Sequence, residues 1–293
     1  MTAAAISPRA ASRGEGFWLR LLFACAARRP WVLRLMRPIV KVGVPLVAPR
    51  VRHAVQQNGR RLLGPDANLK AGNTVAAFYD FIIDLTAARD ATNESLRSRI
   101  TAIDGHDRYL ALRERGGGVV LVTAHMGSFE VGLAGLTGVE EEIHVVFKRD
   151  ANDHFEGLRQ SVRRVLGVHE AAIDDGWPAL VKLRDRLEAG AAIVMQADRA
   201  MPGQKAETVR FGHGHLRLPL GPLRLAQMTG SPIVPVFTVR QPDGRFRVLL
   251  EPAIDPQDDD AMEQLAATLA RVISAHAEQW LVLEPAFVED AIT

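Results

Sequence analysis

Short apolar runs alternate with helical patterns along most of this chain. Runs typical of strands occupy 119–124, 143–148, 191–197, 232–240 and 245–252, the last two joined by the turn Pro242-Asp243-Gly244. Helical patterns occupy 70–112, 153–166, 178–189, 219–228 and 259–283. Strands that alternate with helices form a largely parallel sheet covered on both faces. The sequence therefore predicts an α/β fold, with a mostly parallel central sheet flanked by helices.

In such a sheet the chemistry lies beyond the carboxyl ends of the strands, and the first predicted strand ends at His125. Glu130 follows five residues later. On one continuous helix that spacing separates two side chains by about 140°, so the pair meets only if the chain turns. Gly127 permits a turn, and Ser128 is a good N-cap residue that would place Glu130 in a helix's first turn.

At that position the Glu130 carboxylate would stay ionised beside the helix N-terminus. It would hold one nitrogen of His125 and favour the imidazolium that forms when the other nitrogen takes a proton. We therefore expect His125 to be a general base and Glu130 its orienting group. The chain has no G-x-S-x-G elbow and Cys25 lies in a basic segment, so a covalent nucleophile is not expected.

Charged and polar residues follow the next two strands. Lys148 and Arg149 end the second strand, and Asn152 lies just beyond. These cations either bind a phosphate, from the carrier's pantetheine arm or a lipid headgroup, or form a solvated strand exit. Asp198 and Arg199 follow the third strand. Asp198 orients an acceptor, pairs with Lys148 or caps a turn, and the spacing does not choose among these roles.

Neither a metal ion nor a bound cofactor is expected. The single cysteine excludes an internal disulfide and a zinc cluster built from cysteines. The histidines that remain as candidates show no metal-ligand spacing on a predictable face; they are His144, His154, His169, His213 and His215. The Trp residues at 177 and 280 are interpreted as core residues.

The charge of the chain is unevenly distributed. The formal net charge is +2, but residues 1–61 hold 12 of the 36 Lys and Arg and one of the 34 Asp and Glu. This segment therefore carries +11 and the remainder −9. Trp18 and Trp31 lie among its arginines with many Leu and Val. Its charge-free runs are far shorter than the ~20 residues of a membrane span, and Pro30 and Pro38 predict several short helices.

Basic, Trp- and Leu-rich helices that cannot span a bilayer are typical of the headgroup layer. We therefore predict that residues 1–60 form a basic amphipathic arm on an anionic membrane surface, and that residues 61–293 form the catalytic domain. The alternative is that the arm's apolar residues cover the domain core. Nucleic-acid-binding arms rarely carry so much aliphatic surface, so nucleic acid is not an expected partner.

Four sequence blocks carry a resemblance that covers most of the chain, from about residue 15 to about residue 285. They read AHMGSFE, VVFKRDAN, LEAGAAIVMQADRAMPG and VRFGHGHLRLPLGPLRLAQMTGSPIVPVF. In order and spacing they resemble the bacterial lipid A late acyltransferases, the lauroyl and myristoyl enzymes of the lysophospholipid acyltransferase superfamily. The resemblance implies a peripheral or N-terminally anchored enzyme on the cytoplasmic face of the inner membrane. Its donor would be an acyl-carrier-protein or CoA thioester, and its acceptor a lipid or glycolipid.

The resemblance also assigns roles to single residues. His125 and Glu130 match the family's catalytic H-x4-D/E pair. Lys148 stands where an arginine is usual, Asn152 matches an asparagine, and Asp198 matches the acidic residue of a block that usually reads Asp-Gln. Arg199 replaces that Gln. The resemblance marks Gly212, Pro219, Gly221 and Pro222 as structural or as shaping the acceptor site. Gly127 and Ser128, in the turn after His125, are also expected to shape that site.

Taken together, these features predict an acyltransferase that moves a fatty acyl group from a thioester to a hydroxyl or amine of a lipid acceptor. The thiolate, whose thiol has a pKa near ~8.5, leaves without much help from an acid. Two alternatives are a non-catalytic lipid-binding relative and a hydrolase that uses His125 and Glu130 to activate water. Ser128-Phe129 replaces the family's common Asn-Trp and Lys148 its arginine, so the acceptor is left open.

Overall fold

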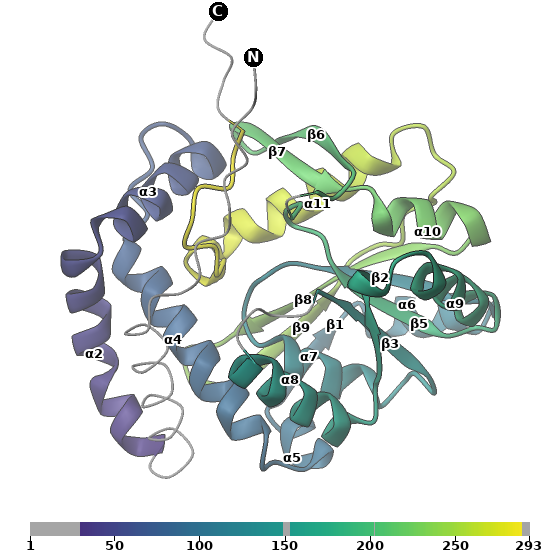
Figure 1. Cartoon of the computed structure of the whole chain (residues 1–293), viewed down its shortest axis with the longest axis horizontal. Helices are drawn as coiled ribbons and strands as arrows, with labels where there is room; N and C mark the ends of the chain where they lie inside the picture. The colour runs from purple at the N-terminus through teal and green to yellow at the C-terminus, as the bar shows by residue number, and fades with distance from the viewer. Residues whose placement is uncertain (1–29, 149–152, 202, 289–293) are drawn as a thin grey trace, which may run out of the picture.

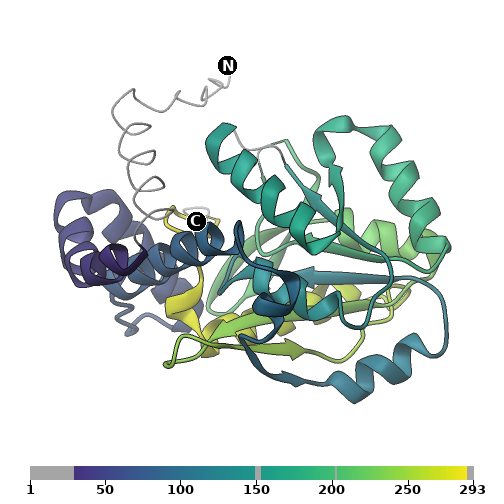
Figure 2. The same cartoon turned by 90° about the horizontal axis from the view of Figure 1, so that it is seen from below.

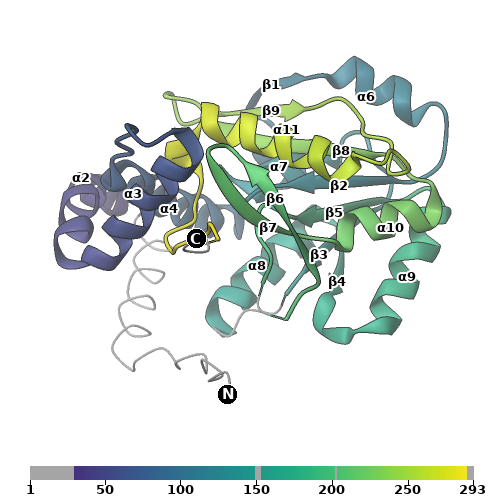
Figure 3. The same cartoon turned by 90° about the horizontal axis from the view of Figure 1, so that it is seen from above.

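The computed structural model describes residues 30–148, 153–201 and 203–288. Figure 1 shows a central sheet between helices, as predicted. The sheet has seven strands in the order β1-β9-β8-β2-β5-β3-β4, which Figure 3 shows from its upper to its lower side. The strands are β1 (Ile100–Asp104), β2 (Val119–Thr123), β3 (Ile143–Phe147), β4 (His169–Ala172), β5 (Ala192–Gln196), β8 (Ile233–Arg240) and β9 (Phe246–Leu250).

Most of the sheet is parallel, which confirms the prediction. The central strand β2 runs parallel to both of its neighbours, β5 and β8, and β3 and β4 keep the same direction. β9 returns antiparallel to β8 through the predicted hairpin, and β1 pairs with β9 in parallel at the edge. All five residues of β2 are buried, as expected for a strand covered on both faces.

Helices cover both faces of the sheet. Val119 and Leu121 of β2 belong to a core with helices α4, α5, α7 and α8, whereas Val120 and Val122 belong to a core with α3, α9, α10 and α11. The helices are α2 (Pro30–Val47), α3 (Pro49–Leu63), α4 (Ala71–Ala88), α5 (Asn93–Arg97), α6 (His106–Arg113), α7 (Phe129–Leu136), α8 (Asp153–Leu166), α9 (Trp177–Glu188), α10 (Gly221–Thr229) and α11 (Ala261–Ala275), with short 3-10 turns at Ile173–Asp175 and Ala277–Gln279.

Helix α2 lies at one end of the molecule, outside α4 (Figures 1 and 2). It continues through Pro38, so the prediction that this proline breaks the helix was wrong. Packing on α4 offsets the backbone hydrogen bond that the proline removes. The hydroxyl of Tyr79 donates to the carbonyl of Leu33 at 3.0 Å, and Arg37 forms an ion pair with Asp80 at 2.8 Å.

The opposite face of α2 carries an apolar stripe. Leu35, Ile39, Val42 and Leu46 follow one another at helical spacing and are 62–67% exposed. We call these four residues the outer stripe of α2. Among the residues described, no helix is both long and apolar enough to cross a membrane.

Only part of the predicted arm falls within the described residues, because residues 1–29, including Trp18, lie outside them. The predicted boundary at residue 60 falls inside α3, whose Val55 and Leu62 pack in the core of the sheet.

Several short elements were not predicted. β1 interrupts the segment 70–112 that was predicted as helical throughout, and β4 follows α8 directly. The strands β6 (Ala206–Phe211) and β7 (Gly214–Pro219) form a separate antiparallel hairpin. These strands are four to six residues long and each exposes part of its side chains, so none produces a continuous apolar run.

Candidate active site

His125 lies just beyond the carboxyl end of the central strand, as predicted. The chain then turns sharply at Gly127, whose φ is +59°, before α7 begins at Phe129. A Cβ atom at Gly127 would lie 1.7 Å from the carbonyl oxygen of Thr238 in β8. Both the backbone angle and this close approach require glycine. The turn therefore holds His125 against the sheet while α7 runs back along it.

The side chain that holds His125 is Asp198. Its Oδ1 lies 2.6 Å from Nδ1 of the imidazole. This contact follows from strand register, because Thr123 of β2 and Gln196 of β5 are paired, and His125 and Asp198 each lie two residues beyond. The Asp198 side chain is fully buried, whereas that of His125 is 30% exposed. A substrate can therefore reach the imidazole but not the carboxylate.

Trp280 completes a chain of three side chains. Its Nε1 donates to Oδ2 of Asp198 at 2.7 Å, so each carboxylate oxygen has a partner. The backbone of the same segment binds the histidine loop, since Met126 and Trp280 form a β-bridge and the N–H of Leu281 donates to the carbonyl of His125 at 2.7 Å. The segment after α11 thus fixes both members of the His125–Asp198 pair.

The electrostatics of this group favour an ionised Asp198. Burial by itself would raise the pKa of Asp198, but the charge of His125 and the hydrogen bonds from His125 and Trp280 lower it below the ordinary value. An ionised carboxylate only accepts hydrogen bonds, so Nδ1 carries the hydrogen of the neutral imidazole. Nε2 then keeps its lone pair for a proton from a substrate.

Glu130, the predicted partner of His125, is placed elsewhere. It is the second residue of α7, only 4% exposed, and it lines a pocket with Phe147, Arg159 and Arg163 on the side of α8. The prediction that it holds the imidazole is corrected by the contact between His125 and Asp198. Burial raises the pKa of Glu130 despite the nearby arginines, and so disfavours the ionised carboxylate that was expected there. Its Oε2 has no hydrogen-bond partner among the described residues.

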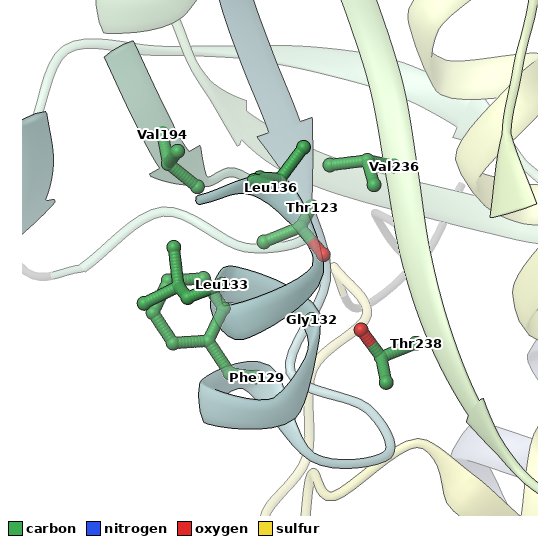
Figure 4. A pocket seen from close by; sticks show the side chains of 8 residues that line it. All are labelled: Thr123, Phe129, Gly132, Leu133, Leu136, Val194, Val236 and Thr238. Carbon is green, nitrogen blue, oxygen red and sulfur yellow. The ribbon is translucent and has the colours of Figure 1, made fainter. Parts of the chain in front are cut away.

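A narrow apolar pocket opens beside the end of β2, between the sheet and α7 (Figure 4). Figure 4 shows Thr123 and Thr238 on one side of α7's first turns, with Phe129 and Leu133 on the other. Of the lining residues, Thr123 lies nearest along the chain to the candidate base, two residues before His125. Its lining consists of Thr123, Phe129, Gly132, Leu133, Leu136, Val194, Val236 and Thr238.

The other predicted binding residues lie in different environments. Lys148 is exposed at the end of β3, and the predicted residues Arg149 and Asn152 lie outside the described part of the chain. Arg199 pairs with Glu284 of the C-terminal segment. Asp198 is fully buried between His125 and Trp280, so neither direct contact with an acceptor nor the alternative pairing with Lys148 applies to it.

Some of the residues that were predicted to shape an acceptor site have structural roles. Ser128 occupies the N-cap position of α7 as predicted, yet its side chain makes no capping hydrogen bond. Gly212 lies in the β6–β7 turn with φ +59°, and a Cβ atom there would lie 2.3 Å from the carbonyl of Leu62. Pro219 ends β7 and Gly221 begins α10. Their contribution to acceptor binding stays a prediction.

Sequence reasoning did not foresee the role of Trp280. It predicted a core residue, and Trp280 is 2% exposed, but no spacing links position 280 to position 198. A buried tryptophan usually finds a partner for its indole N–H, which was the only available signal. Trp177, also predicted as core, is 69% exposed, so that prediction was wrong.

Comparison with known proteins shows which proteins the chain is similar to. Over 197 residues the chain is 29% identical to a phosphatidylinositol mannoside acyltransferase of Mycobacterium tuberculosis, and the match covers 64% of this chain and 60% of the relative. A protein of the same name from Mycolicibacterium smegmatis is 25% identical over 199 residues, covering 67% of this chain and 64% of the relative. The chain thus spans less than two thirds of the length of these relatives.

A family model covers a longer part of the chain. The model described as bacterial lipid A biosynthesis acyltransferase matches residues 69–288, a range that includes His125, Asp198 and Trp280. By this match over most of its length, the chain belongs to the bacterial lipid A biosynthesis acyltransferase family.

Proposed function

We propose that this protein transfers a fatty acyl group from a thioester of acyl carrier protein or coenzyme A to a hydroxyl group of a glycolipid at a membrane surface. The observation that carries the proposal is the chain His125–Asp198–Trp280 at the carboxyl edge of the sheet. It provides a partly exposed base whose orienting carboxylate is sealed from solvent. Family membership and the names of the relatives support the reaction class and an acceptor of the mannolipid type.

The proposed reaction begins when Nε2 of His125 takes the proton of the acceptor hydroxyl. The oxygen attacks the carbonyl carbon of the thioester, and the imidazolium is stabilised by the buried Asp198 carboxylate. Collapse of the tetrahedral intermediate breaks the C–S bond and forms the ester. The thiolate leaves readily because its thiol has a pKa near ~8.5, and it takes the proton that His125 holds.

The apolar pocket beside Thr123 is the proposed place for the start of the acyl chain. Its walls are formed mainly by aliphatic side chains and by the ring of Phe129. A carbonyl carbon next to Thr123 would place the attacking hydroxyl near His125, because both residues lie at the end of the same strand. An apolar chain in this pocket would also exclude water from the reacting groups.

Thiol release distinguishes this function from the alternatives. We expect full-length protein with acyl-CoA or acyl carrier protein to release thiol several times faster when vesicles contain a phosphatidylinositol mannoside or a lipid A precursor. Release is measured with a thiol reagent and the acylated lipid by mass spectrometry. Equal release without any acceptor would indicate a hydrolase, and no release from any donor would indicate a lipid-binding protein.

The outer stripe of α2 supports a peripheral position on the membrane. Four aliphatic side chains on one exposed helical face, with Arg34 and Lys41 exposed on the same helix, fit a surface of anionic lipid. The cytoplasmic face of the inner membrane is the place that this proposal implies, because thioester donors of this class are made in the cytoplasm.

Substitution of the stripe tests this position. The double variant Ile39→Glu/Leu46→Glu is expected to bind anionic vesicles about tenfold or more weakly, since burying one such side chain stabilises by about 1.5–3 kcal/mol. Vesicle sedimentation measures the effect. Both side chains are exposed, so the fold should persist, and Met228→Glu, at an exposed residue of α10, is the matched control. Unchanged binding of the double variant would exclude the stripe as the membrane contact.

A further inference from the structure

A cluster of three possible metal ligands lies at the opposite end of the sheet from His125. It consists of Glu142, just before β3, His144, the second residue of β3, and His169, the first residue of β4. One ligand atom from each lies within 4.8 Å of the others. Because β3 runs parallel to β2, the start of β3 is remote from the carboxyl edge that holds the candidate active site.

The pairing of the two strands creates this cluster. His144 and His169 are register partners in the parallel β3–β4 pair, so their side chains lie next to each other on the same face. The two rings stack with centroids 4.8 Å apart and planes 23° apart. Glu142 lies two residues before His144, and its Oε1 is 2.5 Å from Nε2 of His144. The two histidines are separated by 24 residues, so the sequence alone does not reveal this arrangement.

Helix α9 holds the carboxylate of the cluster in place. Arg186 of α9 donates from Nε and Nη2 to the two oxygens of Glu142, both at 2.7 Å, and so fixes the carboxylate. The cluster therefore presents a carboxylate already held in place beside two stacked imidazoles, and ligation would replace the hydrogen that His144 now shares with Glu142.

We propose that Glu142, His144 and His169 bind one divalent transition-metal ion of the zinc class. Two imidazole nitrogens and one carboxylate oxygen suit Zn²⁺ at about 2.0–2.2 Å, with a fourth position left for water. A carboxylate has about four lone-pair sites, so the two Arg186 contacts leave others for the ion. His144 is buried, but His169 is exposed and Glu142 partly so, which gives the ion a path from solvent.

The position of the cluster indicates a structural role. β4 has four residues and lies at the edge of the sheet, where β3 is its only neighbour among the described strands. A bound ion would tie β4 to β3 and, through Glu142 and Arg186, to α9. This inference is independent of the proposed acyl transfer, because the cluster is separate from His125 and Asp198.

Metal titration of the untagged full-length chain tests the site. We expect calorimetry with Zn²⁺ to detect one site that His169→Gln weakens at least tenfold, while the matched control His215→Gln, at an exposed histidine of β7, leaves it unchanged. Co²⁺ should give the visible spectrum of a four-coordinate ion in the wild type and the control only. Zn²⁺ should also raise the melting temperature of these two proteins more than that of His169→Gln.

The outcomes separate an ion site from a simple hydrogen-bond network. Equal zinc affinity and stoichiometry in the wild type and His169→Gln would overturn the proposal, as would a wild type without any site. His169 is exposed, so loss of binding in His169→Gln with an unchanged circular dichroism spectrum cannot be attributed to unfolding.

Discussion

Replacing His125 with asparagine is expected to lower the rate of acyl transfer by about 10²- to 10⁴-fold, the usual contribution of a general base. Asparagine keeps a side-chain N–H that can donate to Asp198 in place of Nδ1. It has no group that accepts a proton at neutral pH. The variant therefore removes the base without leaving the buried carboxylate unpaired. Initial rates of acceptor-dependent thiol release measure the loss.

The fold of this variant should persist, because His125 is partly exposed and belongs to neither of the two cores of the sheet. His125→Ala should be equally inactive but less stable, since it leaves Oδ1 of Asp198 without its partner. His215→Ala, at an exposed histidine of β7, is the matched control and should keep full activity. Turnover within threefold of the wild type in His125→Asn would remove this residue as the base.

The fold could be predicted wherever burial leaves a continuous apolar signal. The strand β2 is buried at all five positions, and its predicted range of 119–124 differs from the observed strand by one residue. The strands β1 and β4 were not predicted, for the opposite reason. They lie at the two edges of the sheet, where one side is exposed and polar side chains are tolerated. Their sequences ITAID and HEAA therefore carry no strand signal of their own.

The prolines of α2 show where local rules fail. Proline costs a helix one hydrogen bond and about 3 kcal/mol or more in isolation. α2 nevertheless continues through Pro38, because Leu33 and Val40 pack with Tyr79 and Ile83 of α4. The contacts that offset this cost come from a helix more than thirty residues further along the chain, which a local reading does not include.

In the site, the base could be predicted but its partner could not. His125 was identified because it follows the most buried strand, and that observation is local. Glu130 was chosen because it is close in sequence, yet α7 carries it toward α8 and into a buried site. Asp198 is 73 residues away and meets His125 only because β5 is inserted between β2 and β3 in the sheet. Strand order and register therefore decide the pair, and neither is contained in one motif.

The second large effect is expected for Asp198→Asn, with a loss of about 10³- to 10⁴-fold in kcat/KM, as a mis-oriented tautomer of a catalytic histidine produces. The expected loss depends on the hydrogen bond from Trp280 to residue 198. Its indole N–H must donate to an oxygen, so it selects the carbonyl oxygen of the new amide and turns the NH₂ group toward Nδ1 of His125. Nδ1 then becomes the acceptor, the hydrogen moves to Nε2, and the ring can no longer take a proton from the acceptor.

Two further variants decide whether this carboxylate, and not Glu130, orients the base. Glu130→Gln should keep activity within about tenfold, because burial already favours the protonated, uncharged form of Glu130 that glutamine imitates. Adding Trp280→Phe to Asp198→Asn removes the donor that fixes the amide, lets the amide rotate, and should recover part of the lost rate. A purely structural role for Trp280 predicts the reverse, a double variant slower than Asp198→Asn. If Glu130→Gln lost as much activity as Asp198→Asn, the assignment of Asp198 as the orienting partner of His125 would be wrong.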